Sequence, residues 1–389
     1  GTLRNGWVQT QFWNNNLASL NVGSAGTFLP YAGNDVYVDA LTGSGMMGGP
    51  AQSGNSTASV YFGVNNGSGT FSGLISMIDG KLIKMGTGSE VFTGANTYAG
   101  ATEIWNGTLS VSSINSVMSG SMQSSSIGAP TTSGTGTIAL GKYGTTGALM
   151  YTGTGETTDR IILLQGTTGG GVLDQSGMGL LKFTAGSSSN GSFAAGTGAK
   201  TLTLQGSTGG AGEISAGIVD GSPSGPTSLL KLGSGRWVLS GSNTYTGPTM
   251  VNNGWLTLSG TGALASTGSL SVSGGAQFNY LPTTAGTLTL VSGSLYAGST
   301  VGLSFGSTLQ FSGTTALSGT VSFTMSGSYV SGGTYTLLRA ASGLNGSYNL
   351  IGATDYSYLI TASSGSVTLS PTYIGALATA YWKIGRAHV

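Results

Sequence analysis

Residues 82–111 read LIKMGTGSEVFTGANTYAGATEIWNGTLSV, and they align without a gap onto residues 229–258, which read LLKLGSGRWVLSGSNTYTGPTMVNNGWLTL. Fourteen of the 30 aligned positions are identical, at a constant offset of 147 residues. Half of the identities are glycine or asparagine, the residues that most readily adopt positive φ at tight turns. Short β-type runs such as EVFT and ATEIW lie between these turns, and none has a helical period. This repeat predicts the stacked coils of a β-solenoid.

Weaker versions of the same texture surround the two copies. GLLKFTAGSS at 179–188 repeats the LLK start but lacks the NTYxG turn, so we interpret it as a degenerate coil. Short alternating runs recur downstream, at 201–204, 269–273, 287–291, 301–305, 308–313, 320–325, 334–338 and 366–370. A hairpin sheet would contain similar strands, but the wide separation of the copies and the lack of a regular meander spacing favour parallel stacking. The predicted fold is all-β, a right-handed parallel β-helix.

Composition excludes several other classes of protein. Glycine makes up 72 of the 389 residues, and charged residues only 6%. The apolar fraction of 38% and the net charge of +1 argue against disorder, and the 8 prolines without a three-residue glycine period argue against collagen. The 12 basic and 11 acidic residues form no runs, so no nucleic-acid partner and no membrane insertion of this segment are predicted. Without cysteine there is no disulfide framework and no thiolate metal site.

The alternation of polar and apolar residues assigns part of the interior in the second copy. Leu256 and Leu258 are predicted to face inward, and Tyr245, Thr249 and Val251 are candidates just upstream.

Two pairs of equivalent positions carry more specific expectations. The first copy has Glu90 where the second has Trp237, so we expect one of these side chains to lie outside the core, or the register to differ locally. Asn96 and Asn243 are shared, and we predict that both sit at sharp turns where their amides bond neighbouring backbone.

At these residues the chain resembles the autotransporter-associated β-strand repeat, also called the passenger-associated transport repeat, of large bacterial surface proteins. The family pattern is L-x-K-x-G-x-G-x-L-x-L-x-G-x-N-T-Y-x-G-x-T-x-(V/I)-x-x-G-x-L, and both copies depart from it only at Glu90 and Trp237, where it has Leu. Residues 151–184 and 200–221 resemble spacers of long repeat proteins from environmental bacteria such as Verrucomicrobia. The resemblance implies a secreted or cell-surface β-helical passenger or stalk, associated with the bacterial outer membrane, whose repeats support export and folding.

The same reading divides the chain into regions. Residues 1–75 are predicted to be solenoid with an incomplete start, 76–260 a β-helix with both repeats and spacer coils, and 261–372 further irregular coils. Residues 373–382 are expected to begin a following module. The last seven residues, 383–389, read KIGRAHV and resemble a translated sequencing adapter, so His388 is excluded from any site.

Acidic residues were the first candidates for catalysis, because some β-helices cleave polysaccharides with clustered acids. Asp35 and Asp39 in NDVYVDA share strand parity, but four strand residues separate them by ~13 Å, beyond the ~5–9.5 Å of a glycosidase pair. Glu156, Asp159 and Arg160 in GETTDR form the densest charge cluster, and we expect a local surface ion pair there.

The sequence contains no pattern that indicates a metal or cofactor site. GGAGEIS at 209–215 has the glycines of a calcium-binding nonapeptide but lacks its Asp and a tandem copy. We therefore assign no catalytic, cofactor-binding or metal residue and no cofactor.

Two functions remain open from the sequence. The first is a non-enzymatic surface stalk or adhesin with a cell-surface or glycan ligand. The alternative is a carbohydrate-active β-helix, of lyase or hydrolase type, that uses the sparse acids named above.

Overall fold

The computed structural model describes residues 2–4, 15–30, 35–48, 58–76, 80–117, 123–185, 198–221, 225–265, 268–352 and 356–373. It divides into two compact units, residues 1–247 (unit 1) and 248–389 (unit 2). The secondary structure in these described ranges is β-strand throughout. No helix in them is long and apolar enough to cross a membrane. The expected module at 373–382 and the tail at 383–389 lie outside the described residues, except for residue 373.

Four sheets make up unit 1. Sheet 1 contains β1 (Thr2–Arg4), β3 (Thr27–Leu29), β6 (Met46–Gly48) and β9 (Leu74–Ser76). Sheet 2 contains β4 (Val36–Val38), β7 (Val60–Phe62), β10 (Leu82–Lys84), β12 (Thr102–Ile104), β14 (Ile138–Leu140) and β17 (Ile162–Leu164). Sheet 3 runs through β2 (Leu20–Val22), β5 (Leu41–Gly43), β8 (Gly69–Phe71), β11 (Ser89–Phe92), β13 (Gly107–Val111), β15 (Thr146–Tyr151), β18 (Gly170–Gln175), β20 (Lys200–Gly206) and β22 (Thr227–Lys231). Sheet 4 contains β16 (Glu156–Thr158), β19 (Gly179–Phe183), β21 (Gly210–Ile214) and β23 (Arg236–Leu239).

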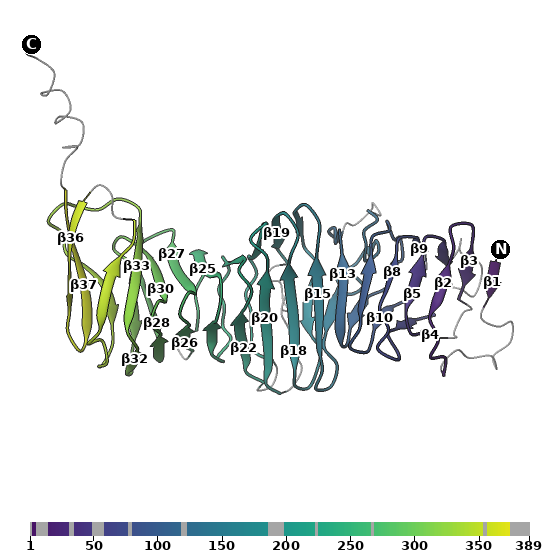
Figure 1. The fold of residues 1–389 in the computed structure, drawn as a ribbon, viewed down its shortest axis with the longest axis horizontal. Helices are drawn as coiled ribbons and strands as arrows, with labels where there is room; N and C mark the ends of the chain where they lie inside the picture. Colours follow the sequence, from purple (N-terminus) through teal and green to yellow (C-terminus); the bar gives the residue numbers. More distant parts are fainter. Residues whose placement is uncertain are drawn as a thin grey trace, which may run out of the picture. The chain divides into compact units, whose positions relative to one another are not determined.

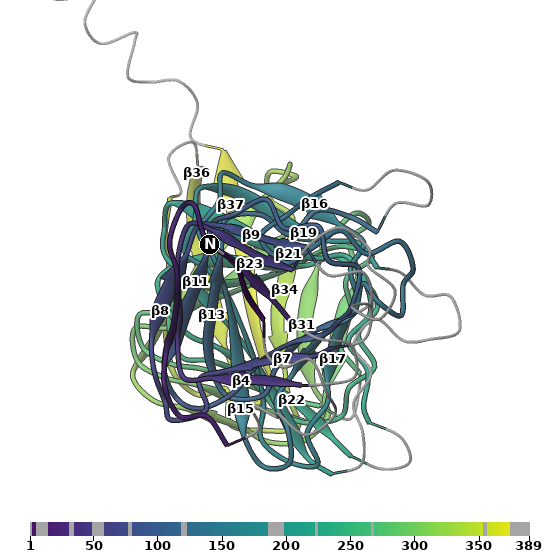
Figure 2. The same cartoon turned by 90° about the vertical axis from the view of Figure 1, so that its right-hand side faces the viewer.

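The order in which the chain visits these sheets makes unit 1 a solenoid. It passes from β4 in sheet 2 to β5 in sheet 3 and β6 in sheet 1, and then repeats that circuit with β7, β8 and β9 (Figure 1). Paired strands in the described part of unit 1 are parallel. In Figure 2 the strands of sheets 2, 3 and 4 form separate faces around a common interior. The predicted parallel β-solenoid is confirmed.

Side chains of equivalent strands form columns inside the coils. In sheet 2 one such column consists of six buried residues that lie in register: Val36, Val60, Leu82, Thr102, Ile138 and Ile162. Alternate residues of the same strands point to the other face of the sheet, where Tyr37 and Tyr61 are partly exposed and Ile83 is buried.

Shared glycines mark the turns in both copies. Gly86 and its equivalent Gly233 have φ of 60° and 64°, and Gly107 and Gly254 have φ of 69° and 64°. Side chains with a Cβ rarely adopt these values, which explains why glycine is kept at these places.

The two sequence repeats occupy different pairs of sheets. In the first copy β10 belongs to sheet 2 and β11 to sheet 3, whereas in the second β22 belongs to sheet 3 and β23 to sheet 4. Sheet 2 ends at β17 among the described strands, and later coils of unit 1 use sheets 3 and 4. The repeat therefore specifies a strand, a corner and a second strand, and it is found on two different pairs of adjacent faces.

Unit 2 continues with three groups of strands. The first contains β24 (Thr249–Val251), β26 (Ser269–Val272), β29 (Ser292–Leu295) and β32 (Thr315–Leu317). The second contains β25 (Trp255–Gly260), β27 (Gln277–Pro282), β30 (Thr300–Ser304), β33 (Thr320–Ser326) and β35 (Ser347–Leu350). The third contains β28 (Thr287–Leu290), β31 (Thr308–Phe311), β34 (Tyr335–Arg339), β37 (Ser366–Tyr373) and β36 (Tyr356–Ala362).

The inward assignments made from the sequence hold, in unit 2 and at the end of unit 1. Leu256, Leu258 and Val251 have no exposed surface, and Thr249 and Tyr245 retain 1–2%.

Parallel stacking does not extend to the last strands. β37 pairs antiparallel with both β34 and β36. Only Ser363, Ser364 and Gly365 link β36 to β37, and so short a connection allows only an antiparallel pair. The expectation of parallel coils up to residue 372 is wrong at this hairpin.

Candidate functional site

The lysine that the two repeats share lies inside the solenoid. Lys84 stands in register between Phe62 and Ile104, and neither Lys84 nor Lys231 has any exposed surface. The Lys84 ammonium donates to the carbonyls of Met85, Gly86 and Asn106, the last two at 3.0 and 3.4 Å.

The second copy repeats this arrangement. The Lys231 ammonium donates to the carbonyls of Leu232 and Gly233, at 2.6 and 2.8 Å. Burial lowers the pKa of Lys84 and of Lys231 to about 8. These lysines hold the following turn by binding its inward-facing carbonyls, so we assign them a structural role.

Glu90 and Trp237 are both fully buried, so the first of the two alternatives, that one of them lies outside the core, is wrong. Trp237 donates its indole N–H to the carbonyl of Gln205 at 2.8 Å. Glu90 accepts the backbone N–H of Leu41 through Oε1 at 3.1 Å, and its Oε2 has no hydrogen-bond partner. A neighbouring glycine leaves room for the Glu90 side chain, since a Cβ on Gly69 would lie 2.9 Å from Glu90 Oε1.

Asn96 and Asn243 are buried and bind backbone, as the sequence predicts. Asn96 accepts the N–H of Ile75 at 2.7 Å and donates to the carbonyl of Ser126 at 2.7 Å, so it joins three segments of chain. Asn243 accepts the N–H of Ile218 at 3.1 Å and donates to Gly241 within its own turn at 2.8 Å.

We expect Asn96→Ala and Asn243→Ala each to lower the free energy of unfolding by about 1–3 kcal/mol, because buried backbone groups lose their partners. Chemical denaturation followed by circular dichroism measures this. Asn65→Ala is the control, since Asn65 is exposed and no side-chain hydrogen bond of it is seen among the described residues. Unchanged unfolding midpoints at both buried positions would refute the structural role.

Asp35 and Asp39 lie at opposite ends of β4, and each binds backbone of the next coil. Asp35 accepts the N–H of Ser59 at 3.2 Å. Asp39 accepts the N–H groups of Asn65 and Gly67 at 2.8 and 2.7 Å. The structure uses these carboxylates to fix turns.

The ion pair expected within GETTDR does not form. Arg160 is 1% exposed and donates to the carbonyls of Gly136, Ile114 and Ile127, at 2.9–3.1 Å. Burial lowers the pKa of this guanidinium to about 10.

The two carboxylates of GETTDR turn to backbone instead of to Arg160. Glu156 accepts the N–H groups of Ile114 and Asn115 at 2.7 and 2.9 Å, and Asp159 accepts that of Val117 at 2.6 Å. These three charged residues fasten the long segment between β13 and β14 to the coil above it. Sequence spacing could not reveal this, because the partners are 24 to 46 residues away.

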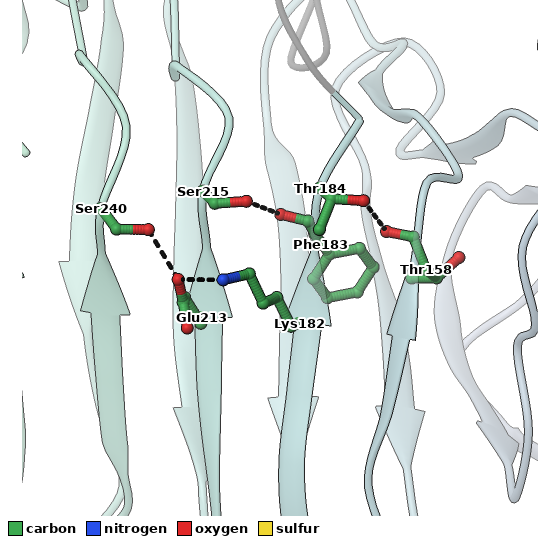
Figure 3. A network of polar contacts seen from close by, with 7 residues as sticks. All are labelled: Thr158, Lys182, Phe183, Thr184, Glu213, Ser215 and Ser240. Carbon is green, nitrogen blue, oxygen red and sulfur yellow. Dashed lines mark hydrogen bonds and ion pairs between the residues drawn. The ribbon is translucent and has the colours of Figure 1, made fainter. Parts of the chain in front are cut away.

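GGAGEIS at 209–215 is a strand that carries an ion pair (Figure 3). Glu213 pairs with Lys182 at 2.8 Å and accepts the hydroxyl of Ser240 at 2.7 Å. Although burial acts to raise it, these two hydrogen bonds hold the pKa of Glu213 below its usual value. Gly212 faces Trp237, whose ring would lie 2.4 Å from an added Cβ. In the described residues no group of three or more His, Cys, Asp or Glu is placed to hold a metal.

The segment interpreted as a degenerate coil contains β19, which pairs in parallel with β16 and β21, but its lysine differs in position from those of the two repeats. Leu181 and Phe183 of β19 are buried, so Lys182 between them faces outward, whereas Lys84 and Lys231 face inward. The sequence LLK recurs there, but each of its residues points to the opposite face of the strand from its equivalent in the two repeats.

A row of aromatic side chains on the outer face of sheet 2 forms the best candidate for a binding site. Tyr37 and Tyr61 lie in register on β4 and β7, and their rings stack at 4.3 Å with an interplanar angle of 1°. Trp105, just after β12, meets Tyr61 edge-on at 5.8 Å. Its indole N–H donates to Glu103 at 2.7 Å, and Glu103 also pairs with Lys81 at 3.1 Å.

A small apolar pocket of about 230 Å³ adjoins this row, lined mainly by Met85, Trp105, Lys142 and Tyr143. The Lys142 ammonium lies 4.9 Å from the Trp105 ring centre and 5.7 Å from that of Tyr143. Tyr143 is 70% exposed and has a φ of 55°, an unusual conformation for a bulky residue.

Thr145 builds the turn that presents Lys142 and Tyr143. Its hydroxyl contacts the carbonyls of Trp105 and Lys142, and its backbone N–H donates to the Lys142 carbonyl at 3.0 Å. The carbonyl of Tyr143 accepts the N–H groups of Thr167 and Thr168 at 2.8 and 3.0 Å. Sequence analysis did not identify this site, since GKYG at 141–144 reads as an ordinary turn and only the coil stacking brings it to Trp105.

Comparison with known proteins agrees with the resemblance. The family model for the passenger-associated transport repeat matches residues 82–111 and 229–258. An adhesin, the BmaC autotransporter of Brucella suis biovar 1 (strain 1330), is 36% identical over 215 residues. That match covers 55% of this chain, which spans 6% of the length of the relative. No solved structure matches the chain. The chain thus contains two passenger-associated transport repeats, as the sequence predicts.

Proposed function

We propose that this chain is a segment of a non-enzymatic β-helical passenger, secreted or displayed at the bacterial cell surface in association with the outer membrane, and that it acts in adhesion. The observation that carries the proposal is the match of two solenoid-forming repeats to the passenger-associated transport repeat, together with 36% identity to an autotransporter named as an adhesin. Stacked coils supply a stable scaffold, and an outer face with aromatic side chains supplies contact area.

The carbohydrate-cleaving alternative receives no support from the positions of the acids. Glu156 and Asp159 were the best candidates, and both already accept backbone N–H groups. Hydrolysis needs one acid to give a proton and a second to act as base or nucleophile, both free to reach the substrate.

Adhesion can be tested with the purified full chain coated on beads. We expect coated beads to remain on epithelial cell layers several-fold more often than beads coated with heat-denatured chain. Equal retention of the two bead types contradicts the proposal.

Catalysis is tested separately, by incubating the chain with pectin, alginate and cell-wall glycans. We expect no new reducing ends. Cleavage that disappears in a Glu156→Gln, Asp159→Asn double variant would establish the enzymatic alternative instead.

A further inference from the structure

We propose that the pocket beside Trp105 binds a carboxylated sugar ring, such as a uronic or sialic acid, as the ligand through which the chain adheres. The ammonium of Lys142 pairs with the carboxylate, and the rings of Tyr143 and Trp105 contact the C–H face of the sugar. This inference rests on the proposed adhesive function and names the chemical class of its ligand.

The charges around the pocket favour an anion. Lys142 forms no ion pair with any residue that the structure describes. Glu103, the acid that contacts Trp105, is already engaged by Lys81 through one oxygen and by Trp105 through the other. The ammonium of Lys142 therefore has no ion-pair partner among the described residues, and it lies 4.9 and 5.7 Å from the centres of two aromatic rings.

The size and lining of the pocket favour one sugar ring. Its volume of about 230 Å³ is below the ~300–1,000 Å³ typical of drug-sized ligands. A carboxylated pyranose carries an apolar C–H face and a charge on one rigid ring, which matches aromatic walls beside one cation. The aromatic row of Tyr61 and Tyr37 continues from Trp105, so further sugar units of an oligomer would meet more ring surface.

The turn that carries the site is pre-organised. Thr145 fixes its backbone against Trp105, and Tyr143 is held at a positive φ by contacts with the next coil. A bulky residue in this conformation is strained, and strain of this kind is concentrated at functional sites. A fixed turn also loses little conformational entropy on binding.

Two other classes of ligand fit less well. An acidic peptide side chain offers a carboxylate but no rigid apolar face. Single-stranded nucleic acid offers both a base to stack and a phosphate, but it needs a groove with many cations, and the chain has a net charge of only +1.

Isothermal titration calorimetry of the full chain tests the proposal with tri-galacturonic acid and 3′-sialyllactose as the two acidic sources and lactose as the neutral probe. We expect at least one acidic sugar to bind at least tenfold more tightly than lactose. Lys142→Gln should lower the affinity for it about tenfold, whereas Lys182→Gln, which removes a paired lysine on sheet 4, should change it less than twofold.

Tyr143→Gly separates binding from folding. Glycine accepts a φ of 55° without strain, so this variant should keep or raise the unfolding midpoint while binding falls at least tenfold. Equal binding of lactose and the acidic sugars, unchanged binding in both pocket variants, or tighter binding of a thymidine oligonucleotide would each overturn the proposal.

Bead retention on cells distinguishes this inference from adhesion itself. If the unaltered chain retains beads and both pocket variants retain them equally well, adhesion stands and the pocket is not its site. If the acidic sugars bind and the variants lose that binding, but no chain retains beads, the site stands and the proposed function fails.

Discussion

Trp237→Ala is expected to lower the free energy of unfolding of unit 1 by about 3–5 kcal/mol, the usual cost of removing a large side chain from a packed core. Trp237 has no exposed surface, and its indole N–H is the donor to the carbonyl of Gln205. The alanine variant therefore leaves a cavity and removes a hydrogen-bond donor from the part-buried carbonyl of Gln205. Denaturant titration followed by far-ultraviolet circular dichroism measures the loss.

Two further variants make this measurement specific. Gly212→Ala should also destabilise unit 1, by about 1–3 kcal/mol, because its new methyl group would overlap the Trp237 ring. Trp255→Ala removes a tryptophan that is 51% exposed, so its cost should stay below about 1 kcal/mol. Similar losses for Trp237→Ala and Trp255→Ala would mean that Trp237 is not a core residue.

Glu90→Gln is expected to abolish a fall in stability that the natural protein shows as pH rises from about 5 to 8. Burial raises the pKa of Glu90 from 4.5 to about 8, opposed by the N–H of Leu41 and the charge of Lys84, whereas the charge of Asp39 raises it further. The folded protein therefore holds a proton that the unfolded chain has released. Each unit of such a pKa difference corresponds to about 1.4 kcal/mol, so the fall should amount to a few kcal/mol.

The sign of this effect follows from the direction of the pKa shift. The contribution of Glu90 is fully present below about pH 4.5 and is lost as the pH approaches 8. Glutamine can still accept the N–H of Leu41 but cannot ionise. Free energies of unfolding measured from pH 5 to 9 should therefore diverge between the two proteins, with Glu90→Gln the more stable at high pH. Parallel pH profiles would show that Glu90 stays ionised.

Lys84 makes the free energy of unfolding rise with pH, the opposite of the effect of Glu90, and it does so at higher pH. Its pKa is lowered to about 8 in the folded protein from 10.5, so the unfolded chain binds more protons and stability rises between these values. Lys84→Met should remove this rise, which makes it the matched control for the measurements on Glu90→Gln.

Local patterns in the sequence were sufficient to predict the fold. Gly and Asn indicate the tight turns, and the alternation of polar and apolar residues in the strands predicts that Leu256 and Leu258 face inward. Both signals depend only on residues that are close together in the chain. Among the described strands, the prediction of parallel pairing failed at β37, which runs antiparallel to both β34 and β36, and a three-residue link sets the direction of the β36–β37 pair.

The interior polar groups and the candidate site could not be predicted in the same way. Glu90 and Arg160 break the rule that charged residues lie outside, because Glu90 accepts a backbone N–H and Arg160 donates to backbone carbonyls of segments far away in the sequence. The pocket beside Trp105 needs Lys142 and Tyr143, 37 and 38 residues downstream, to arrive at the same level of the stack. The number of residues between coils varies, so no fixed spacing reveals which side chains meet.

The placement of the two repeats on different pairs of sheets has a consequence for how such genes can change. The same repeat sequence occupies sheets 2 and 3 in one copy and sheets 3 and 4 in the other, so the flanking chain can be joined at equivalent points of the two copies. Unequal recombination between them would delete or duplicate the intervening 147 residues and still leave one intact repeat at the junction. Copy number can therefore drift within a lineage, and paralogues should differ in length by whole coils while their turns retain the same lysine and asparagine.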